Sequence, residues 1–402
     1  MWFYMSHIAP RQLAMQRGEP EIHSSLSDLY SPWRGTQELL LHHRDPYSAP
    51  VTRDIQVGYY GRALDGSPGG PRDQQRFAYP VYVAFLLSPA MNLSFDTVRS
   101  LARWGLLGIT LASVPLWMRL VGERISLLSL IAAALLTVGS VPAMEGFNLQ
   151  QLALLVAGLL AGSAALLARG RYIPAGVFLA LASIKPQISS LVTAWLILWA
   201  VSDWRKRRGF LWGWLGTMAV LVLAGVWILP AWIIEFGRGL VAYAAYTDSS
   251  SWLELWLPRW LAVVVAGLAG LWVLTVAWRT RRVASDSVGF AFAFALILTV
   301  TIAVVPGTKP TYNQVLLLPG LLLAASRAGA AWKEHWLSRA GMVFWWCVVI
   351  APWILAAGVV AVWLISPEAV RRVWAAPVYV ALLLPLGGFG LLMVMRKECL
   401  EC

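Results

Sequence analysis

Long apolar runs, separated by short polar segments, follow one another along the chain from about residue 97 onward. A helix needs roughly 20 apolar residues to cross about 30 Å of hydrocarbon, and nine of these runs are candidates for such a span. Within a few residues they cover 97–121, 126–143, 148–168, 210–230, 261–278, 288–305, 311–326, 341–365 and 375–395.

The run 173–201 differs from the others because it is too long for one span and contains Lys185-Pro186 in its middle. A charge at mid-membrane depth is costly, and proline disrupts a helix interior. We therefore predict two short helices, 173–184 and 187–201, that fold back at Lys185. The total is then eleven crossings.

Residues 79–92, "YPVYVAFLLSPAMN", have only about ten apolar residues in their core, with a proline near each end. This pattern favours an interfacial or re-entrant helix over a span. We therefore divide the chain into a first loop with interfacial helices, residues 1–96, and a single transmembrane helical domain, residues 97–402. If 79–92 did span, the first loop would face the cytoplasm.

The composition agrees with an all-α polytopic membrane protein. The 402 residues are 59% hydrophobic and 13% charged, whereas soluble domains are about 45–50% apolar and about 25% charged. The formal net charge is +12, but its basic residues lie between apolar runs rather than in one patch. They therefore indicate membrane orientation rather than nucleic-acid binding.

The basic residues also predict sidedness. With the loop "DWRKRR" (203–208) in the cytoplasm and alternating crossings, sixteen Lys and Arg after residue 103 face the cytoplasm and six face the other side. This is the usual positive-inside bias. The C-terminus is then cytoplasmic and the first loop extracytoplasmic. Because nothing before residue 77 resembles a signal peptide, we expect a further, first transmembrane helix upstream, which would make twelve.

Polar residues gather on the predicted outer side, in loops from several parts of the chain. A cation there could hold a phosphate, and a carboxylate could accept a proton from an attacking hydroxyl, which suits group transfer from an anionic lipid. The candidates are the carboxylates Asp28, Asp45, Glu145 and Asp248, the cations Lys185 and Lys309, and the amides Asn148, Gln150, Gln151, Asn313 and Gln314.

Several of these residues also have a structural interpretation. Asp28 could cap the helix predicted for "RGTQELLLHH", and "DPY" (45–47) could be the turn that closes that helix. His42 or His43 with Asp45 could bind a metal or simply be a solvated surface. Lys185 could extend to the membrane interface.

The remaining segments leave similar alternatives open. Glu145 and the amides at 148–151 could cap the next helix, and Asn313 and Gln314 could pack against a neighbouring helix. Residues 242–256 could form an amphipathic helix that covers a lipid groove or merely lies on the membrane. The three cysteines form no disulfide framework. Since zinc usually takes four protein ligands, the terminal pair Cys399 and Cys402 does not predict a metal site.

A succession of loose motifs resembles the GT-C glycosyltransferases, and among them glycosyltransferase family 87, which includes polyprenyl-phosphate-mannose-dependent mannosyltransferases. The matching pieces are "DLYSPWRGTQELLLHHRDPY" (28–47), "FAYPVYVAFLLSP" (77–89), "AMEGFNLQQLALLVAGLLAG" (143–162), "RGRYIPAGVFLALASIKPQISSLV" (169–192), "DWRKRR" and "VVPGTKPTYNQVLLLPG" (304–320).

This resemblance implies a GT-C fold and an inverting transfer, without metal or cofactor, of a hexose such as mannose from a polyprenyl phosphate. The acceptor would be a hydroxyl of a lipid or glycan on the outer face. By the resemblance Asp28 is the general base, and we expect Lys185 and Lys309 to bind the donor phosphate. The expected substrate contacts are Tyr30, Arg34, Asp45, Tyr47, Asn148, Gln150, Tyr312, Asn313 and Gln314.

The sequence departs from the family pattern at one place, and two other functions remain as alternatives. Family members often carry a histidine in the loop that matches 306–314, where this chain has Tyr312, Asn313 and Gln314; mannose and the family's acceptor contacts therefore do not carry over directly. A lipid or solute transporter would also gather polar groups at helix breaks, although no internal repeat is visible. The other alternative is a non-catalytic scaffold of envelope assembly.

Overall fold

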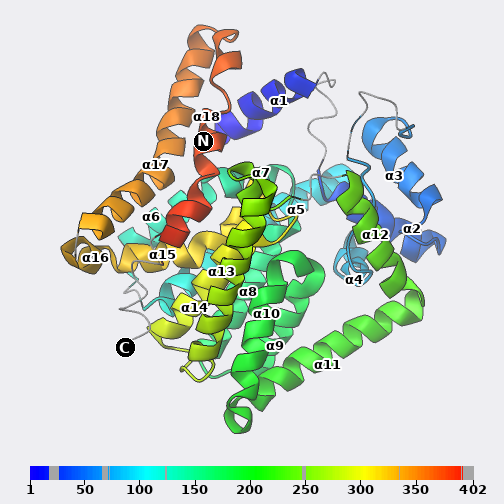
Figure 1. Cartoon of the computed structure of the whole chain (residues 1–402). Coiled ribbons are helices and arrows are strands. Elements are labelled where there is room, and N and C mark those ends of the chain that lie inside the picture. The colour runs from blue at the N-terminus through cyan, green and yellow to red at the C-terminus, as the bar shows by residue number, and fades with distance from the viewer. Residues whose placement is uncertain are drawn as a thin grey trace.

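The computed structural model describes residues 1–17, 27–65, 71, 73–122, 125–246, 250–334, 336–390 and 392. Over these residues the protein is helical and contains no strand, which confirms the predicted all-α class (Figure 1). Six residues used in the sequence predictions lie outside the described part: Arg124, Asp248, Arg396, Lys397, Cys399 and Cys402.

The helices of the first half of the chain are η1 (Tyr4–Ile8), α1 (Ala9–Arg17), α2 (Tyr30–His42), α3 (Ala49–Tyr60), α4 (Val83–Leu87), η2 (Ser88–Ala90), α5 (Phe95–Leu120), α6 (Leu127–Val138), α7 (Val141–Asn148), α8 (Leu152–Ala168), α9 (Tyr172–Leu181), η3 (Ala182–Ile184) and α10 (Pro186–Val201). Those of the second half are α11 (Trp204–Ile228), α12 (Trp232–Tyr246), η4 (Trp252–Leu255), α13 (Arg259–Thr280), α14 (Val288–Val304), η5 (Thr311–Leu317), α15 (Leu318–Ser326), α16 (Ala328–Glu334), α17 (Trp336–Ile365), η6 (Ala369–Arg372) and α18 (Ala376–Ala381).

Five helical segments of the described chain are long and apolar enough to cross a membrane: α5, α11, α13, α17 and Ala369–Gly390. They become six if α6 and α7, which are bent by 58° at their junction, form one broken span. Four further apolar segments, α8, α9 with η3, α10 and α14, are 10–17 residues long. A multi-pass membrane protein is thus supported, and the count of eleven crossings stays a prediction.

Three predicted elements need correction. The run 126–143 is divided at Gly139, between α6 and α7. The run 311–326 is not one helix, because the 3-10 helix η5 covers its first part and α15 starts anew at Leu318, with Pro319 in its first turn, where proline is tolerated. The helix predicted at 242–256 lies largely earlier in the chain: α12 covers Trp232–Tyr246, and in the described residues 250–256 the short η4 is the helical element. Residues 79–92 form only α4 and η2, which are too short to span.

The chain reverses direction at Lys185, as its lysine-proline pair predicts. Pro186 opens α10, where its missing N–H is not needed. The rings of Tyr172, at the start of α9, and Trp199, near the end of α10, have centroids 6.2 Å apart. The two helices therefore run back alongside each other, with Lys185 at one end of the hairpin.

Helix α9 lies very close to α11, and two glycines make this approach possible. A Cβ atom on Gly176 would come within 2.2 Å of the Phe210 carbonyl oxygen, and one on Gly213 within 2.2 Å of the Ile173 carbonyl oxygen. Small residues at helix crossings are a common device of membrane proteins, since they let two backbones meet. This crossing ties α11 to the hairpin.

At the opposite end of α10 from Lys185, the buried Arg207 joins three segments. Its guanidinium donates to the carbonyl oxygens of Trp199 (2.6 Å), Arg281 (2.8 Å), Arg282 (3.2 Å) and Val283 (3.0 Å) and lies 3.9 Å from the Trp199 ring centroid. Carbonyl groups at the ends of helices have no partner within the helix. Arg207 thus caps the ends of α10 and α13 together; we call this arrangement the Arg207 clasp.

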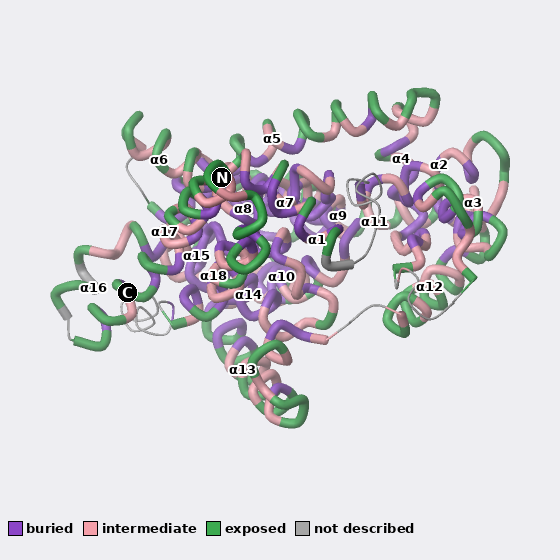
Figure 2. Tube along the Cα trace, turned by 90° about the horizontal axis from the view of Figure 1, so that it is seen from above, coloured by how far each residue is buried: buried purple, intermediate pink, exposed green. Residues whose placement is uncertain are grey.

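Buried residues concentrate in the centre of the molecule, around α8, α10 and α14, and exposed residues lie at its periphery (Figure 2). The helices α2, α3 and α4 of the first loop stand with α12 to one side of this core in both views (Figures 1 and 2). The first residues of the chain pack elsewhere, since the Tyr4 hydroxyl donates to the Trp374 carbonyl oxygen (2.5 Å).

Candidate active site

A cavity of about 470 Å³ lies where the first loop, the α7–α8 turn, the Lys185 break, α12 and the loop before η5 meet. We call it the Asp28 cavity. Its wall is formed by Asp28, Ser31, Asp73, Gln75, Arg76, Ala78, Tyr79, Gln151, Ile184, Lys185, Pro186, Gln187, Ser190, Leu240, Tyr243, Ala244, Pro306, Gly307, Tyr312 and Asn313.

The backbone around Asp28 is held against the α7–α8 turn. The amide of Asp28 donates to the Leu149 carbonyl oxygen (3.1 Å), and the hydroxyl of the buried Ser27 donates to the same oxygen (3.0 Å). The Ser27 oxygen also accepts from the Leu29 amide (3.1 Å), whereas the N-cap position of α2 has no side-chain cap. The interpretation of Asp28 as a helix cap is therefore wrong, and its carboxylate is left for the cavity.

One amide links the carboxylate of Asp28 to the ammonium group of Lys185. The Nε2 atom of Gln151 donates to Asp28 Oδ2, and Lys185 Nζ donates to Gln151 Oε1 (2.8 Å). Gln151 and Lys185 are 3% and 5% exposed, so both are held inside the protein and Lys185 does not extend to a lipid interface. Lys185 Nζ also lies 5.1 Å from the centroid of the Tyr312 ring.

The α7–α8 turn places Gln151 by an unusual backbone conformation. Gln150 has a φ of 47°, in the left-handed region, and the amide of Gln151 then donates to the Gly146 carbonyl oxygen (2.8 Å). Helix α8 starts only after this turn, and its N-cap residue Gln151 makes no side-chain cap. The capping interpretation of this amide is therefore wrong as well.

The surroundings of Asp28 favour its protonated form. Burial, and to a smaller extent the nearby carboxylate of Asp73, raise the pKa of Asp28 to about 6, against the opposing effects of the Lys185 ammonium and the hydrogen bond from Gln151. A carboxylate with a pKa in this range can take up a proton near neutral pH, as a general base must.

Five of the candidates from the sequence line the Asp28 cavity together: Asp28, Gln151, Lys185, Tyr312 and Asn313. They come from positions as far apart as 28 and 313. The amide nitrogen of Asn313 donates to the Thr308 carbonyl oxygen (3.1 Å), and its buried Oδ1 has no hydrogen-bond partner within the described residues. The structure thus brings a carboxylate, an ammonium group, a phenol and an amide to one space.

The other predicted contacts of the first loop lie outside the cavity wall. Tyr30 packs against the rings of Trp33, Tyr59 and Phe95. Three further residues are placed by local contacts: Arg34 pairs with Glu38 (2.6 Å), Asp45 accepts from the Tyr47 amide (2.9 Å) in a turn, and the Tyr47 hydroxyl donates to the Tyr79 carbonyl oxygen (2.6 Å).

The predicted residues of the later loops are also dispersed. Asn148 donates to the Met5 carbonyl oxygen (2.8 Å), and Gln150 turns back onto the backbone at Phe147 and Asn148. Lys309 donates to the Ser250 hydroxyl (3.0 Å) and is not in the wall. Gln314 lines a second, largely apolar cavity of about 350 Å³, and Glu145 lines neither.

Sequence reasoning missed several wall residues, among them Asp73, Gln75, Arg76, Tyr79 and Tyr243. The signal was the polar run "DQQR" (73–76) directly before the apolar "FAYP", which marks a chain passing from solvent into the protein. Within the described residues, His, Cys, Asp and Glu form no group of three or more that could hold a metal. His42 and His43 are both exposed.

Comparison with known proteins identifies the family of this chain. The sequence model of glycosyltransferase family 87 matches residues 77–306, more than half of the chain and including Gln151, Lys185 and Tyr243. No curated protein and no solved structure matches it significantly. The match favours a transferase over the transporter and scaffold alternatives. The chain belongs to glycosyltransferase family 87, and it is therefore a membrane glycosyltransferase.

Proposed function

We propose that this glycosyltransferase moves a hexose such as mannose from a polyprenyl-phosphate donor to a hydroxyl group of a lipid or glycan acceptor. The observation that carries the proposal is the chain of contacts from Asp28 through Gln151 to Lys185 in the wall of one cavity. It sets a base and a cation in fixed relation, and a phosphoryl-linked sugar requires both.

In the proposed reaction the acceptor oxygen attacks the anomeric carbon of the sugar. The bond between that carbon and the phosphate oxygen breaks, and its electron pair leaves with the polyprenyl phosphate. The hydroxyl proton passes to the Asp28 carboxylate, which acts as general base. Because a single displacement occurs on the face opposite the leaving group, the configuration at the anomeric carbon inverts.

Lys185 is the proposed contact of the leaving phosphate. Its ammonium group is buried in the wall and fixed by Gln151, so it needs little rearrangement to meet the charge that develops on the phosphate oxygen. Tyr79, Tyr243, Tyr312 and Asn313 would contact the sugar. We do not include Lys309, because Ser250 holds it outside this wall.

We also propose that the Asp28 cavity faces away from the cytoplasm. Lys185, in the cavity wall, and the Arg207 clasp lie at opposite ends of α10, and the basic loops near the clasp are the type that stays in the cytoplasm. With eleven crossings, the C-terminus is cytoplasmic and the donor head group meets the first loop on the outer face.

The decisive variant is Asp28→Asn, which keeps the shape of the side chain and removes its basicity. In membranes supplied with labelled polyprenyl-phosphate sugars, we expect transfer to fall at least about 100-fold, the usual contribution of a general base. Asp96→Asn, at an exposed residue in the first turn of α5, is the matched control. Undiminished transfer by an Asp28→Asn protein would exclude Asp28 from the mechanism.

A further inference from the structure

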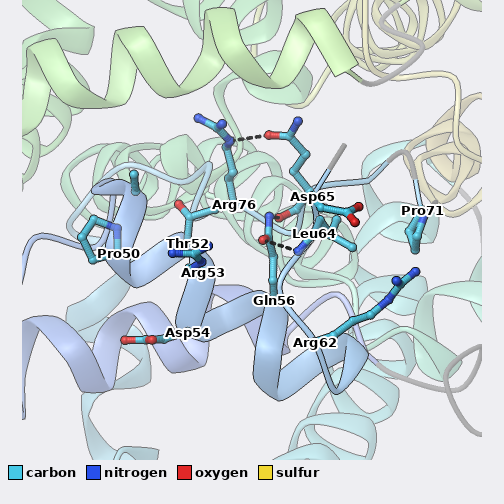
Figure 3. A pocket seen from close by; sticks show the side chains of 12 residues that line it. Pro50, Thr52, Arg53, Asp54, Gln56, Arg62, Leu64, Asp65, Pro71 and Arg76 are labelled. Atoms are coloured by element: carbon cyan, nitrogen blue, oxygen red, sulfur yellow. Dashed lines mark hydrogen bonds between the residues drawn. The ribbon is translucent and has the colours of Figure 1, made fainter. Parts of the chain in front are cut away.

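A second, polar hollow of about 580 Å³ adjoins the Asp28 cavity (Figure 3). It lies between α3 and residues 73–76, and its described wall residues include three arginines: Arg53, Arg62 and Arg76. We call it the arginine pocket. Nothing in the proposed transfer so far uses these arginines.

Hydrogen bonds, rather than loose side chains, hold the walls of the arginine pocket together. The Gln56 side chain, 7% exposed, donates to the Gln74 carbonyl oxygen (3.0 Å) and accepts from the Leu64 amide (3.1 Å). Arg76 Nε donates to the Gln74 side-chain oxygen (2.7 Å). Two of these bonds are visible in Figure 3. These bonds fix the part of the wall that is formed by Gln56, Leu64, Gln74 and Arg76, and Arg53 and Arg62 stand exposed beside it.

The charge of the pocket favours an anionic ligand. Two carboxylates line it beside the arginines: Asp54, which is paired with Arg44 (2.7 Å) outside the wall, and Asp65. The side chains of Arg53 and Arg62, in contrast, form no ion pair or hydrogen bond with any residue in the described part of the chain. A guanidinium group can bind a phosphate or carboxylate through two parallel N–H donors. The guanidinium groups of Arg53 and Arg62 are available for such binding.

Residues 73–76 lie between the two hollows. Asp73 and Gln75 line the Asp28 cavity, Gln74 lines the arginine pocket, and Arg76 lines both. The segment turns at Gln75, which has a φ of 49° and whose amide donates to the Asp73 carboxylate (2.9 Å), and Arg76 borders both hollows. A molecule that passes Arg76 can reach both the free arginines and the Asp28 carboxylate.

We infer that the arginine pocket is the acceptor subsite and that it binds a phosphate or carboxylate group of the acceptor, while the reacting hydroxyl enters the Asp28 cavity. This rests on the proposed function for the hydroxyl, but the anion site stands on its own geometry. The pocket thereby selects acidic acceptors over neutral ones of the same size.

Binding of defined probes to the purified full-length chain tests the inference without the transfer reaction. The probes are glucose 1-phosphate and methyl glucoside in solution, and short-chain phosphatidylglycerol and phosphatidylcholine in nanodiscs. We expect the wild type to bind the anionic member of at least one pair, more weakly as ionic strength rises. In the Arg53→Gln/Arg62→Gln variant, its Kd should increase about tenfold or more, because charge-assisted hydrogen bonds are lost.

Arg103→Gln, which removes an exposed arginine on α5, is the control and should leave binding unchanged. Binding of the soluble probe indicates an acidic glycan, and binding of the lipid alone indicates a lipid head group. Equal Kd values in wild type and the double variant, or no preference for the anionic probes, would overturn the inference. The two proposals can also fail separately. If the double variant loses binding but the Asp28→Asn protein transfers sugar normally, the anion site is supported and the role of Asp28 as general base is excluded.

Discussion

The acidity of Asp28 is set by its burial and by three neighbours that act in opposite directions. Burial and Asp73 raise its pKa, and Lys185 and the hydrogen bond from Gln151 lower it. As the proposed base must be ionised, kcat/KM should decrease as the pH falls through about 6. This decrease is the acidic limb of the pH profile. The direction in which the limb moves in a variant indicates whether the substituted neighbour raised or lowered the pKa of Asp28.

Asp73→Asn removes a negative charge, so the pKa of Asp28 should decrease and the acidic limb should move to lower pH. We expect a shift of under about one pH unit, because Asp73 is exposed and solvent screens it. Lys185→Met should move the limb to higher pH and raise the KM for the donor. The pH dependence of kcat/KM is measured for both variants, with Asp96→Asn as the reference. If both variants kept the acidic limb of the wild type, Asp28 would not be the base.

Individual residues of the site were predictable where a residue type is unusual for its position. Lys185 in an apolar run and Asp28 before a helix stand out in the sequence. The contacts of Gln151 do not, because its partners are distant in the sequence: Asp28 lies 123 positions before it and Lys185 lies 34 positions after it. Arg34 lies outside the cavity wall for a local reason: Glu38 stands four residues later on the same helix face, where it pairs with Arg34.

At the scale of the elements, the crossing of α9 and α11 depends on the absence of side chains. Gly213→Ala would place a Cβ atom 2.2 Å from the Ile173 carbonyl oxygen, so the two helices must separate. We expect a loss of about 1–3 kcal/mol, the usual cost of overpacking, seen as a lower Tm of the detergent-purified protein.

Gly216→Ala is the matched control for this prediction, because it lies on the same helix and a Cβ atom there meets nothing within 4 Å. It should leave the Tm unchanged or raise it slightly, since alanine is the better helix former. Equal Tm values for the two variants would contradict the close helix contact.

The element boundaries followed from apolar length where a run was uninterrupted, as in α5, α13 and α14. They failed where proline or glycine divides a run: at Gly139, between α6 and α7, and at Pro319, in α15. Hydrophobicity reports burial in lipid or protein alike, so it does not reveal such breaks. The lysine-proline pair at 185–186 was an exception, because its charge made the break visible.

For the whole molecule, the proposal requires that the Asp28 cavity and the basic loops lie on opposite sides of the membrane. In a chain without its native cysteines, Asp73→Cys reports on the cavity and Arg208→Cys on the basic start of α11; both positions are exposed. An impermeant thiol reagent should label Asp73→Cys in intact cells and Arg208→Cys only after permeabilisation. The reverse pattern would place the cavity in the cytoplasm and exclude the proposed donor topology.

The Arg207 clasp has a consequence for how such a large donor is admitted. By joining the ends of α10 and α13 through four carbonyl groups, it prevents these helices from sliding past each other at the end remote from the cavity. We therefore expect the hairpin of α9 and α10 to keep its position during the catalytic cycle. The motions that admit and release the isoprenoid chain would then take place in α12 and the helices of the first loop.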